Sequence, residues 1–375
     1  MKIIIASDSF KGSLTSAEVA TAAARGIKAV YPDCQVISVP VADGGEGTVD
    51  ALMQALGGEI VSTTVHDPLS RPIQAYYAVI GTMAVIEMAT ASGLPLLSIQ
   101  ERNPWLTSTH GTGEMIMDAI KRGCRQFLIG IGGSATNDAG TGMLQAMGFR
   151  FYDANNNEIL HCSGGSMHHI RRIDDTCVPE ALRQSSFTIA CDVDTPFCGK
   201  EGAAHVFASQ KGADTTMVHQ LDYGMASLAK VIDNKYHINI ANIAGAGAAG
   251  GMGGAFCAFL GAKLQRGIDV ILETIHFRQI IQNADLIITG EGKIDSQTSK
   301  GKVPMGVLSY AKEQNIPVIA IAGCVEKSES IMQMGFAGVY SIREPKQSIR
   351  LAMRKDVAAE NVENTIKKIM KNMRF

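Results

Sequence analysis

Acidic and basic side chains suited to phosphoryl transfer stand beside glycines at several places in the sequence. In chain order they are Lys11 in DSFKGS, Asp43 and Glu46 in DGGEG, Asp192 and Asp194 at and after the end of FTIACD, and Glu291, Lys293 and Asp295 in TGEGKID. Carboxylate oxygens bind Mg²⁺, a lysine balances charge on a phosphate, and a free carboxylate accepts a hydroxyl proton. Taken singly, each is more often a solvated turn residue or a helix cap. Their repetition at predicted strand ends favours a phosphotransferase.

A glycine-rich segment, GIGGSATNDAGTG at 130–142, connects the apolar run QFLIG to the helix-like run MLQAMG. Backbone N–H groups at such a turn bind phosphate, and glycines allow the close approach this needs. Polar side chains follow at Thr136, Asn137 and Asp138, where they suit contact with a ligand or a metal; the alternative is that Asn137 or Asp138 caps the helix. No Gly-Lys pair is followed by Ser or Thr, which excludes a Walker A loop.

The same glycines also fit a second chemistry. Gly130, Gly132 and Ala135 match the dinucleotide pattern G-x-G-x-x-A, with Asp153 placed as the acid that binds a ribose. A second match lies at 245–250 in AGAGAAGGMGG, and two matches in one chain show how unspecific the pattern is. An NAD-dependent oxidoreductase acting on a small hydroxy acid therefore stays an alternative.

Composition points to a small-molecule partner. The 375 residues are 46% hydrophobic with a net charge of -2, so the chain has no general field that would attract nucleic acid or an anionic membrane. Eight cysteines without a C-x-x-C pair predict reduced, mostly buried thiols. MKIIIASDSF is too short in apolar residues for a signal-peptide core, and the uncharged stretch 244–262 is mostly Gly and Ala. We expect a cytoplasmic protein, with 244–262 as buried loop and helix.

Short β-branched runs alternate with helical patterns, which predicts an α/β fold. KIIIA at 2–6 reads as a buried strand, and Thr15 with Glu18 forms a capping box for the helix that follows. VISVPVA at 36–42 predicts a second strand and TVDALMQAL at 48–56 a second helix. IVSTTV, AYYAVI and AVIEMA, between 60 and 89, indicate antiparallel strands, and the βα rhythm returns from residue 284 in DLIITG, PVIAIAG and AGVYSI.

The same alternation of strand-like and helix-like runs occurs at both ends of the chain, which predicts two α/β domains. The first is a discontinuous parallel-sheet domain, Rossmann-like or flavodoxin-like, formed by 1–65 and 285–375. The second is an inserted α/β domain with a mixed sheet, formed by 66–284.

Four long segments in order resemble the class I glycerate kinase family: PVADGGEGT, GIGGSATND, GAGAAGGMG and ITGEGKIDSQTSKGKVPMGV. ASDSFKGSLTSAEVA, DPLSRP, STHGTGE and QKGA fit the same pattern, so the resemblance covers about residues 1 to 345. It implies ATP-dependent, Mg²⁺-assisted phosphorylation of D-glycerate in a cleft between two α/β domains, with 2-phosphoglycerate favoured over 3-phosphoglycerate. Departures are small: Ser7 replaces a usual proline, Ala139 a usual glycine, Ala208-Ser209 a usual Gly-Pro, and Asp194-Thr195 a Thr/Ser-Asn-like pair.

On this basis each candidate receives a role. For catalysis we expect Lys11, Asp192 as the base, and Lys293; for substrate, Asp8, Ser9 and Arg71; for Mg²⁺, Glu291 and Asp295 with Asp43 or Glu46. The nucleotide is assigned to Gly130, Gly132, Gly133, Ser134, Asn137, Asp138, Gly245, Gly247 and Gly250. No nucleic-acid or membrane partner is expected, and a homodimer is compatible with the sequence. Beside the oxidoreductase, a sugar-acid-binding regulator without turnover stays open.

Overall fold

The computed structural model describes residues 1–295, 298, 301–326, 331 and 333–373. The chain forms two compact units. Unit 1 comprises Met1–Asp43, Asp50–Leu56 and Ile268–Phe375, and unit 2 comprises Gly44–Val49 and Gly57–Gly267. The predicted α/β class is confirmed, with a parallel sheet in one unit and a mixed sheet in the other. The predicted domain boundaries at 65/66 and 284/285 stay a prediction.

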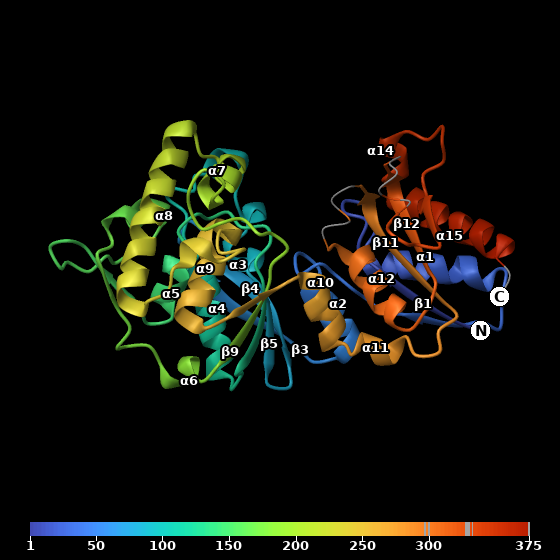
Figure 1. Cartoon of the computed structure of the whole chain (residues 1–375), viewed down its shortest axis with the longest axis horizontal. Coiled ribbons are helices and arrows are strands. Elements are labelled where there is room, and N and C mark those ends of the chain that lie inside the picture. Colours follow the sequence, from blue (N-terminus) through green and yellow to red (C-terminus); the bar gives the residue numbers. More distant parts are fainter. Residues whose placement is uncertain (296–297, 299–300, 327–330, 332, 374–375) are drawn as a thin grey trace. The chain divides into compact units, whose positions relative to one another are not determined.

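Unit 1 is built on a five-stranded parallel sheet from both ends of the chain, so that in Figure 1 a blue strand lies among orange and red ones. Its order is β13-β12-β11-β1-β2, with β1 at Lys2–Ser7, β2 at Gln35–Ser38, β11 at Leu286–Ile294, β12 at Val318–Val325 and β13 at Gly338–Ser341. Numbered within the unit this is the flavodoxin-like order 2-1-3-4-5. The chain leaves β1 toward one edge and β11 toward the other, so the switch point of the sheet lies between β1 and β11.

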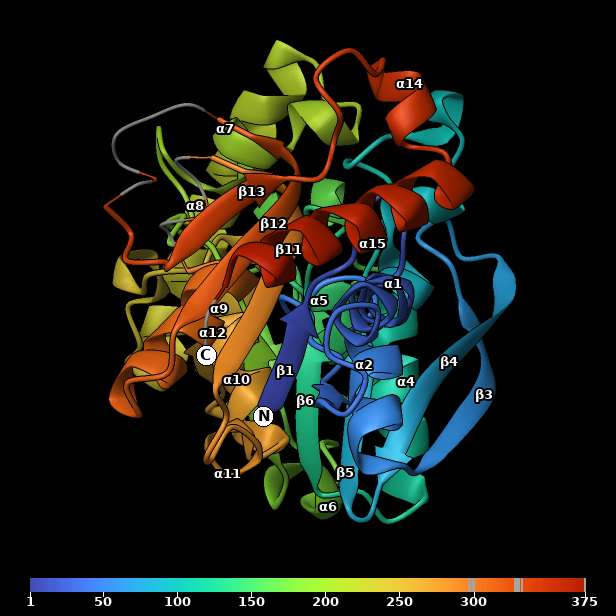
Figure 2. The same cartoon turned by 90° about the vertical axis from the view of Figure 1, so that its right-hand side faces the viewer.

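Helices cover this sheet on both faces, which explains the continuous apolar run of β1, where Ile3, Ile4 and Ile5 are fully buried. The described helices of unit 1, two of which begin in unit 2, are α1 (Ser16–Lys28), α2 (Thr48–Leu56), α10 (Gly267–Thr274), α11 (Phe277–Ile280), α12 (Val303–Glu313), α14 (Ile349–Ala352) and α15 (Lys355–Asn372). The capping box that begins α1 is confirmed: Glu18 N–H donates to Thr15 Oγ1 (3.3 Å) and Thr15 N–H to Glu18 Oε2 (3.0 Å). α1 and α15 lie side by side (Figures 1 and 2).

Two predicted strand ends in unit 1 are wrong. β2 ends at Ser38 rather than Ala42, because after Val39 N–H has bonded Ile5 O (2.8 Å) the chain reaches Pro40, which has no N–H. β11 does not stop at the glycines of TGEGKID: Glu291, Gly292 and Lys293 are part of the strand. β12 continues to pair with β11 beyond the end of β1, as far as Ile294 and Val325, which keeps this segment extended.

Unit 2 contains a six-stranded mixed sheet in the order β10-β9-β6-β5-β4-β3. The strands are β3 (Glu59–His66), β4 (Pro72–Ile80), β5 (Met83–Glu87), β6 (Gln126–Gly130), β9 (Ser186–Ala190) and β10 (Lys263–Gln265). The antiparallel pairs predicted between 60 and 89 are confirmed as β3–β4 and β4–β5, while β5, β6, β9 and β10 are parallel. β7 (Arg150–Tyr152) and β8 (Arg172–Asp174) form a separate two-stranded sheet.

The helices of unit 2 are α3 (Ala89–Ser92), α4 (His110–Lys121), α5 (Thr141–Ala146), α6 (Glu180–Arg183), α7 (Ala203–Phe207), α8 (Thr215–Tyr236) and α9 (Ala248–Leu260). Within the described part of the chain, no helix has both the length and the apolar character needed to cross a membrane. All eight cysteines are unpaired; three are buried, three are half-buried, and Cys177 and Cys324 are exposed, so the expectation of mostly buried thiols holds only in part.

Candidate functional site

A pocket of about 430 Å³ opens in unit 1 at the carboxyl ends of β1, β11 and β12. This is the switch point of the sheet, where open α/β sheets bind their ligands. The polar lining comes from Asp8, Ser9, Lys11, Ser13, Asp43, Glu291, Lys293, Lys302, Arg343 and Asn361, and the apolar lining includes Phe10, Ile342, Ile349, Ala352 and Met353. Most of the charged residues singled out in the sequence of unit 1 therefore face one pocket.

Asp8 is the most buried carboxylate of this pocket apart from Glu291. It follows β1 directly, and because Ser7 pairs with Gly290, Asp8 comes beside Glu291 of the neighbouring strand; Asp8 N–H donates to Gly290 O (2.9 Å). Burial, together with the negative charges of Asp43 and Glu291, raises the pKa of Asp8 to about 7. A carboxyl group with this pKa exchanges a proton near neutrality.

Glu291 is also buried, with 6% of its surface exposed. Thr298 Oγ1 donates to Glu291 Oε1 (2.6 Å), and Lys302 Nζ lies 3.4 Å from Oε2. Burial nevertheless raises the pKa of Glu291 above its ordinary value. The roles assigned from the sequence do not include Lys302, although it lies in the segment ITGEGKIDSQTSKGKVPMGV. Four residues of that segment, Ser296, Gln297, Ser299 and Lys300, lie outside the described residues.

Two exposed lysines pair with carboxylates at the rim. Lys11 Nζ lies 3.7 Å from Asp43 Oδ2, and Lys293 Nζ lies 2.9 Å from Asp295 Oδ2, with 68% and 58% of the lysine side chains exposed. Asp295 does not line the pocket, but its charge contributes to the raised pKa of Glu291. Glu46 belongs to unit 2 and is exposed.

The clustered carboxylates fit a hard divalent cation. Asp43 and Glu291 each help to raise the pKa of Asp8, which shows that these negative charges destabilise one another in the protein alone. A cation bound by their oxygens relieves that repulsion, and Mg²⁺ takes oxygen ligands, usually including one or two protein carboxylates. The donor set is therefore suited to Mg²⁺.

In unit 2 the glycine segment offers only a short exposed stretch of backbone. Gly132 and Gly133 are exposed, with Gly133 at φ 77°, whereas Ser134 to Gly142 are buried. Asn137 is fully buried and its Nδ2 donates to Met225 Sδ (3.3 Å). Gly132 and Gly133 are therefore the exposed residues of the segment between 130 and 142.

Asp138 is engaged inside the protein. Its carboxylate accepts hydrogen bonds from Thr109 N–H (2.8 Å), Thr109 Oγ1 (2.8 Å), Gly140 N–H (3.1 Å) and Gly142 N–H (3.2 Å). The carboxylate therefore bonds backbone at the starts of both α4 and α5, whereas the N-cap residue of α5 is Gly140, without a side-chain cap. Contact of Asp138 with a ligand stays a prediction. Ala139, in place of the glycine that the resemblance predicts, adopts φ 52°, a conformation that costs a non-glycine residue about 1 kcal/mol or more.

Lys211 supports the glycine segment from within and was not assigned a role from the sequence. It is 1% exposed, and its Nζ donates to Ser134 Oγ (2.7 Å) and to Thr136 O (2.6 Å). Burial lowers the pKa of Lys211 to about 7, although the charge of Asp138 favours its protonated form. Its only sequence signal is its place in QKGA.

The second glycine run packs on the first. A Cβ on Gly250 would overlap Thr136 O, and Ala139 N–H donates to Gly250 O (2.9 Å). Gly247 is equally close to Pro196 O, and Gly245 lies against Val193 O. Gly245, Gly247 and Gly250 are buried, so the structure brings these motifs together through backbone packing.

Asp192 and Arg71 lie in settings that differ from expectation. Asp192 comes two residues after β9 and is exposed, so the desolvated setting expected for it is absent; its Oδ1 accepts Gly267 N–H (2.9 Å). Arg71 is exposed too, and its guanidinium contacts Asp67 (2.6 Å) and Glu101. Both belong to unit 2.

The glycine segment that begins at Gly130 does not have the geometry of a dinucleotide-binding motif. In that motif a helix begins directly at the glycines, but α5 begins only at Thr141. Asp153 follows a strand of the small two-stranded sheet, and its carboxylate accepts the N–H groups of Asn155 and Asn157 (both 2.8 Å). It is therefore a turn residue.

Replacing Lys211 with Met should change both the stability of the protein and its pH dependence. Loss of two buried hydrogen bonds is expected to lower the free energy of unfolding by about 1–3 kcal/mol. In the wild type the folded pKa of about 7 lies below the ordinary 10.5, so the unfolded chain binds the extra proton between these values and stability rises with pH across that window. Urea unfolding near pH 7 and near pH 9.5 should show this rise in the wild type and in an exposed control, Lys230→Met, but a weaker rise in Lys211→Met. Equal slopes in all three proteins would contradict the assignment.

Comparison with known proteins agrees with the resemblance of the motifs. A family model described as the glycerate kinase family matches residues 3–374. The chain is 44% identical to a Bacillus subtilis glycerate kinase over 100% of this chain and 98% of the relative, and 44% identical to an Escherichia coli glycerate 2-kinase over 91% and 90%. A crystal structure of the presumed glycerate kinase 2 from Salmonella typhimurium superposes with a TM-score of 0.89 at 43% identity, covering 99% of this chain and 97% of that one. The chain belongs to the glycerate kinase family.

Proposed function

We propose that this protein transfers the γ-phosphoryl group of ATP to D-glycerate with the help of Mg²⁺, forming 2-phosphoglycerate. The observation that carries the proposal is the unit 1 pocket, which combines buried Asp8 and Glu291 with Asp43, Lys11 and Lys302. Phosphoryl transfer needs positioned positive charge and a carboxylate for the attacking hydroxyl, and little covalent chemistry from the protein. The name of the Escherichia coli relative, glycerate 2-kinase, supports the 2-hydroxyl as the acceptor.

Glu291 and Asp295, with Asp43, are the candidate Mg²⁺ ligands, of which one or two bind the ion at a time. When bound, Mg²⁺ supplies charge stabilisation for the phosphate oxygens. Lys293 and Lys11 neutralise Asp295 and Asp43 in the protein alone, and they become available to phosphate when the carboxylates bind a cation. Glu46, which is exposed in unit 2, has less support as a ligand.

Asp8 is the proposed acceptor of the hydroxyl proton. Its burial favours the neutral form and so raises its pKa toward neutrality. A general base is most effective when its pKa lies near the working pH. Asp192 stays the competing candidate from the sequence, but it is exposed whereas Asp8 is buried.

The nucleotide phosphates are proposed to contact the N–H groups of Gly132 and Gly133, because these two residues are the exposed part of the glycine segment. Arg71 and Ser9 remain the proposed groups for the substrate. Arg71 is already paired with two carboxylates, so its guanidinium must leave one of them to bind glycerate. If Arg71 binds glycerate in this way, Arg71→Ala should raise the KM for glycerate. An unchanged KM would remove Arg71 from the site.

The purified protein should release ADP only when ATP, Mg²⁺ and D-glycerate are all present. A coupled ADP assay separates this activity from a regulator that binds without turnover, and substitution of NAD for ATP tests the oxidoreductase alternative. The ³¹P signal of the product should be split into a doublet by the single hydrogen on carbon 2. A triplet, from the two hydrogens on carbon 3, would identify 3-phosphoglycerate, and absence of any ester would refute the kinase.

Asp295→Asn should raise the Mg²⁺ concentration needed for half-maximal activity by at least about tenfold, because loss of even a supporting group typically weakens metal binding 10–100-fold. The measurement is a Mg²⁺ titration at saturating ATP and glycerate. Asp33→Asn, an exposed position in unit 1, is the control and should leave the titration unchanged. If both variants behave like the wild type, Asp295 is not a ligand.

Asp8→Asn keeps the size of the side chain but removes its basicity, so kcat should fall by about 10²–10⁴-fold with the KM for ATP little changed. The acidic limb of the kcat/KM profile, expected at or below about pH 7 because bound Mg²⁺ lowers the pKa further, should disappear in this variant. Asp192→Asn should retain a near-normal kcat and the limb. The reverse outcome would return the role of base to Asp192.

A further inference from the structure

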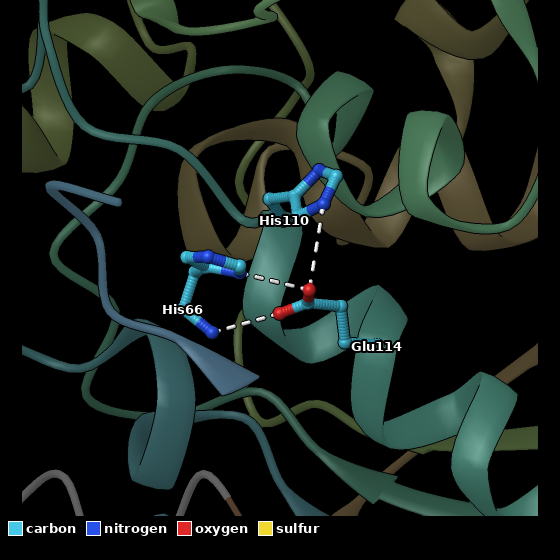
Figure 3. A group of neighbouring side chains, drawn as sticks. All are labelled: His66, His110 and Glu114. Atoms are coloured by element: carbon cyan, nitrogen blue, oxygen red, sulfur yellow. Dashed lines mark hydrogen bonds and ion pairs between the residues drawn. The ribbon is translucent and has the colours of Figure 1, made fainter. Parts of the chain in front are cut away.

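Two imidazoles and a carboxylate meet in unit 2, and none of the three residues is assigned above to catalysis, nucleotide, substrate or Mg²⁺. His66 is the last residue of β3, His110 is the first residue of α4, and Glu114 follows one turn later in the same helix. One potential ligand atom from each lies within 4.8 Å of the other two. Figure 3 shows both rings directed at the same oxygen of Glu114.

The backbone is built for this meeting. A Cβ on Gly111 would overlap His66 O, so only glycine lets the first turn of α4 approach the end of β3 so closely. The spacing from His110 to Glu114 places both side chains on one face of the helix. Glu114 Oε2 accepts the backbone N–H of His66 (2.7 Å), which orients the carboxylate and leaves Oε1 for the rings.

The separations of the three atoms are close to those of a metal site. His66 Nδ1 lies 2.8 Å from Glu114 Oε1, and His110 Nε2 lies 3.7 Å from the same oxygen. Ligand atoms about 2.0–2.1 Å from a tetrahedral ion are separated from one another by about 3.3 Å. The two ring nitrogens lie within 4.8 Å of each other. All three separations therefore reach the tetrahedral value with changes of at most about 1.5 Å, which side-chain torsions supply.

The chemistry of the donors selects the class of ion. Imidazole nitrogen suits Zn²⁺ and its first-row neighbours, and Mg²⁺ takes oxygen ligands instead. Burial lowers the pKa of His110, which favours the neutral ring that binds a metal. The side chains of His66, His110 and Glu114 are 45%, 36% and 26% exposed, so an ion has access from solvent and water can complete its coordination.

We propose that His66, His110 and Glu114 form a binding site for one Zn²⁺-class ion, with His66 Nδ1, His110 Nε2 and Glu114 Oε1 as its protein ligands. The ion replaces the hydrogen bond between His66 and Glu114 and links the end of β3 to the start of α4. Since both elements belong to unit 2, occupancy should stabilise this unit.

Equilibrium competition with a chromophoric zinc chelator, using the full-length, tag-free protein in Mg²⁺-free buffer under reducing conditions, tests the proposal. The wild type should bind one Zn²⁺ per chain and gain thermal stability on binding. His66→Gln and His110→Gln should each weaken that binding by more than about 100-fold, because even loss of a supporting group typically costs 10–100-fold. The matched control is His219→Gln, an exposed histidine of α8 that should leave the affinity unchanged.

Co²⁺ substitution identifies the ligands independently of stability. The visible d–d bands of a four- or five-coordinate nitrogen and oxygen site should appear in the wild type and in His219→Gln, and should be lost in His110→Gln. A strong near-ultraviolet thiolate band would instead assign the ion to cysteine and overturn the proposal. Zinc binding that is equal in the wild type and both site variants, or no binding at all, would leave a hydrogen-bonded trio without an ion and would also overturn it.

Discussion

The parallel pairing of β1 with β11 is the interaction on which the unit 1 pocket depends. It joins segments from opposite ends of the chain, and at its start Lys2 N–H bonds Asp285 Oδ2 across 283 positions of sequence (2.7 Å). The register that follows pairs Ser7 with Gly290, so that Asp8 and Glu291 leave the sheet side by side. Burial is the main cause of the raised pKa of each carboxyl, and the register places the two buried groups side by side.

The same pairing concentrates charge that the unit must balance. Each of the pocket carboxylates Asp43 and Glu291 lies near a lysine, and these lysines come from separate segments. Among the described ion pairs, none places a lysine as close to Asp8. The pKa of this carboxyl is raised, chiefly by its burial. A pocket that keeps one carboxyl poised near neutrality while others are paired resembles the way enzymes separate a base from metal ligands.

In unit 2, buried polar groups fix the conformation of the backbone around the glycine segment. Asp138 accepts four hydrogen bonds around the start of α5, and Lys211 donates two to the glycine segment. Burying such groups costs free energy unless their bonds are made, so each bond that is present restricts the loop to one conformation. Gly132 and Gly133 are therefore exposed residues of a loop whose buried part is fixed by the hydrogen bonds of Asp138 and Lys211.

Local features of this fold were accessible from the sequence. The capping box at Thr15, the apolar run of β1 and the antiparallel strands between 59 and 87 each follow from short-range chemistry, and all were found where expected. The end of β11 was not, because pairing with β12 overrides the tendency of glycine to interrupt a strand. Lys302 and Lys211 were passed over for a related reason: a lysine is ordinarily a solvated residue, and only its packing partners show otherwise.

The sequence by itself determined the α/β class, most of the strands and helices and, through its long motifs, the family. Periodicity, caps and turn residues act over a few positions, and they persist whatever the rest of the chain does. Tertiary structure decided that Asp8 is buried while Asp192 is exposed, that the Asp138 carboxylate bonds backbone inside unit 2, and that Lys211 bonds the glycine segment from its buried side. Burial and the distance between charges set these roles, and both depend on strand register and helix packing between segments far apart in the chain, which no short stretch of sequence specifies.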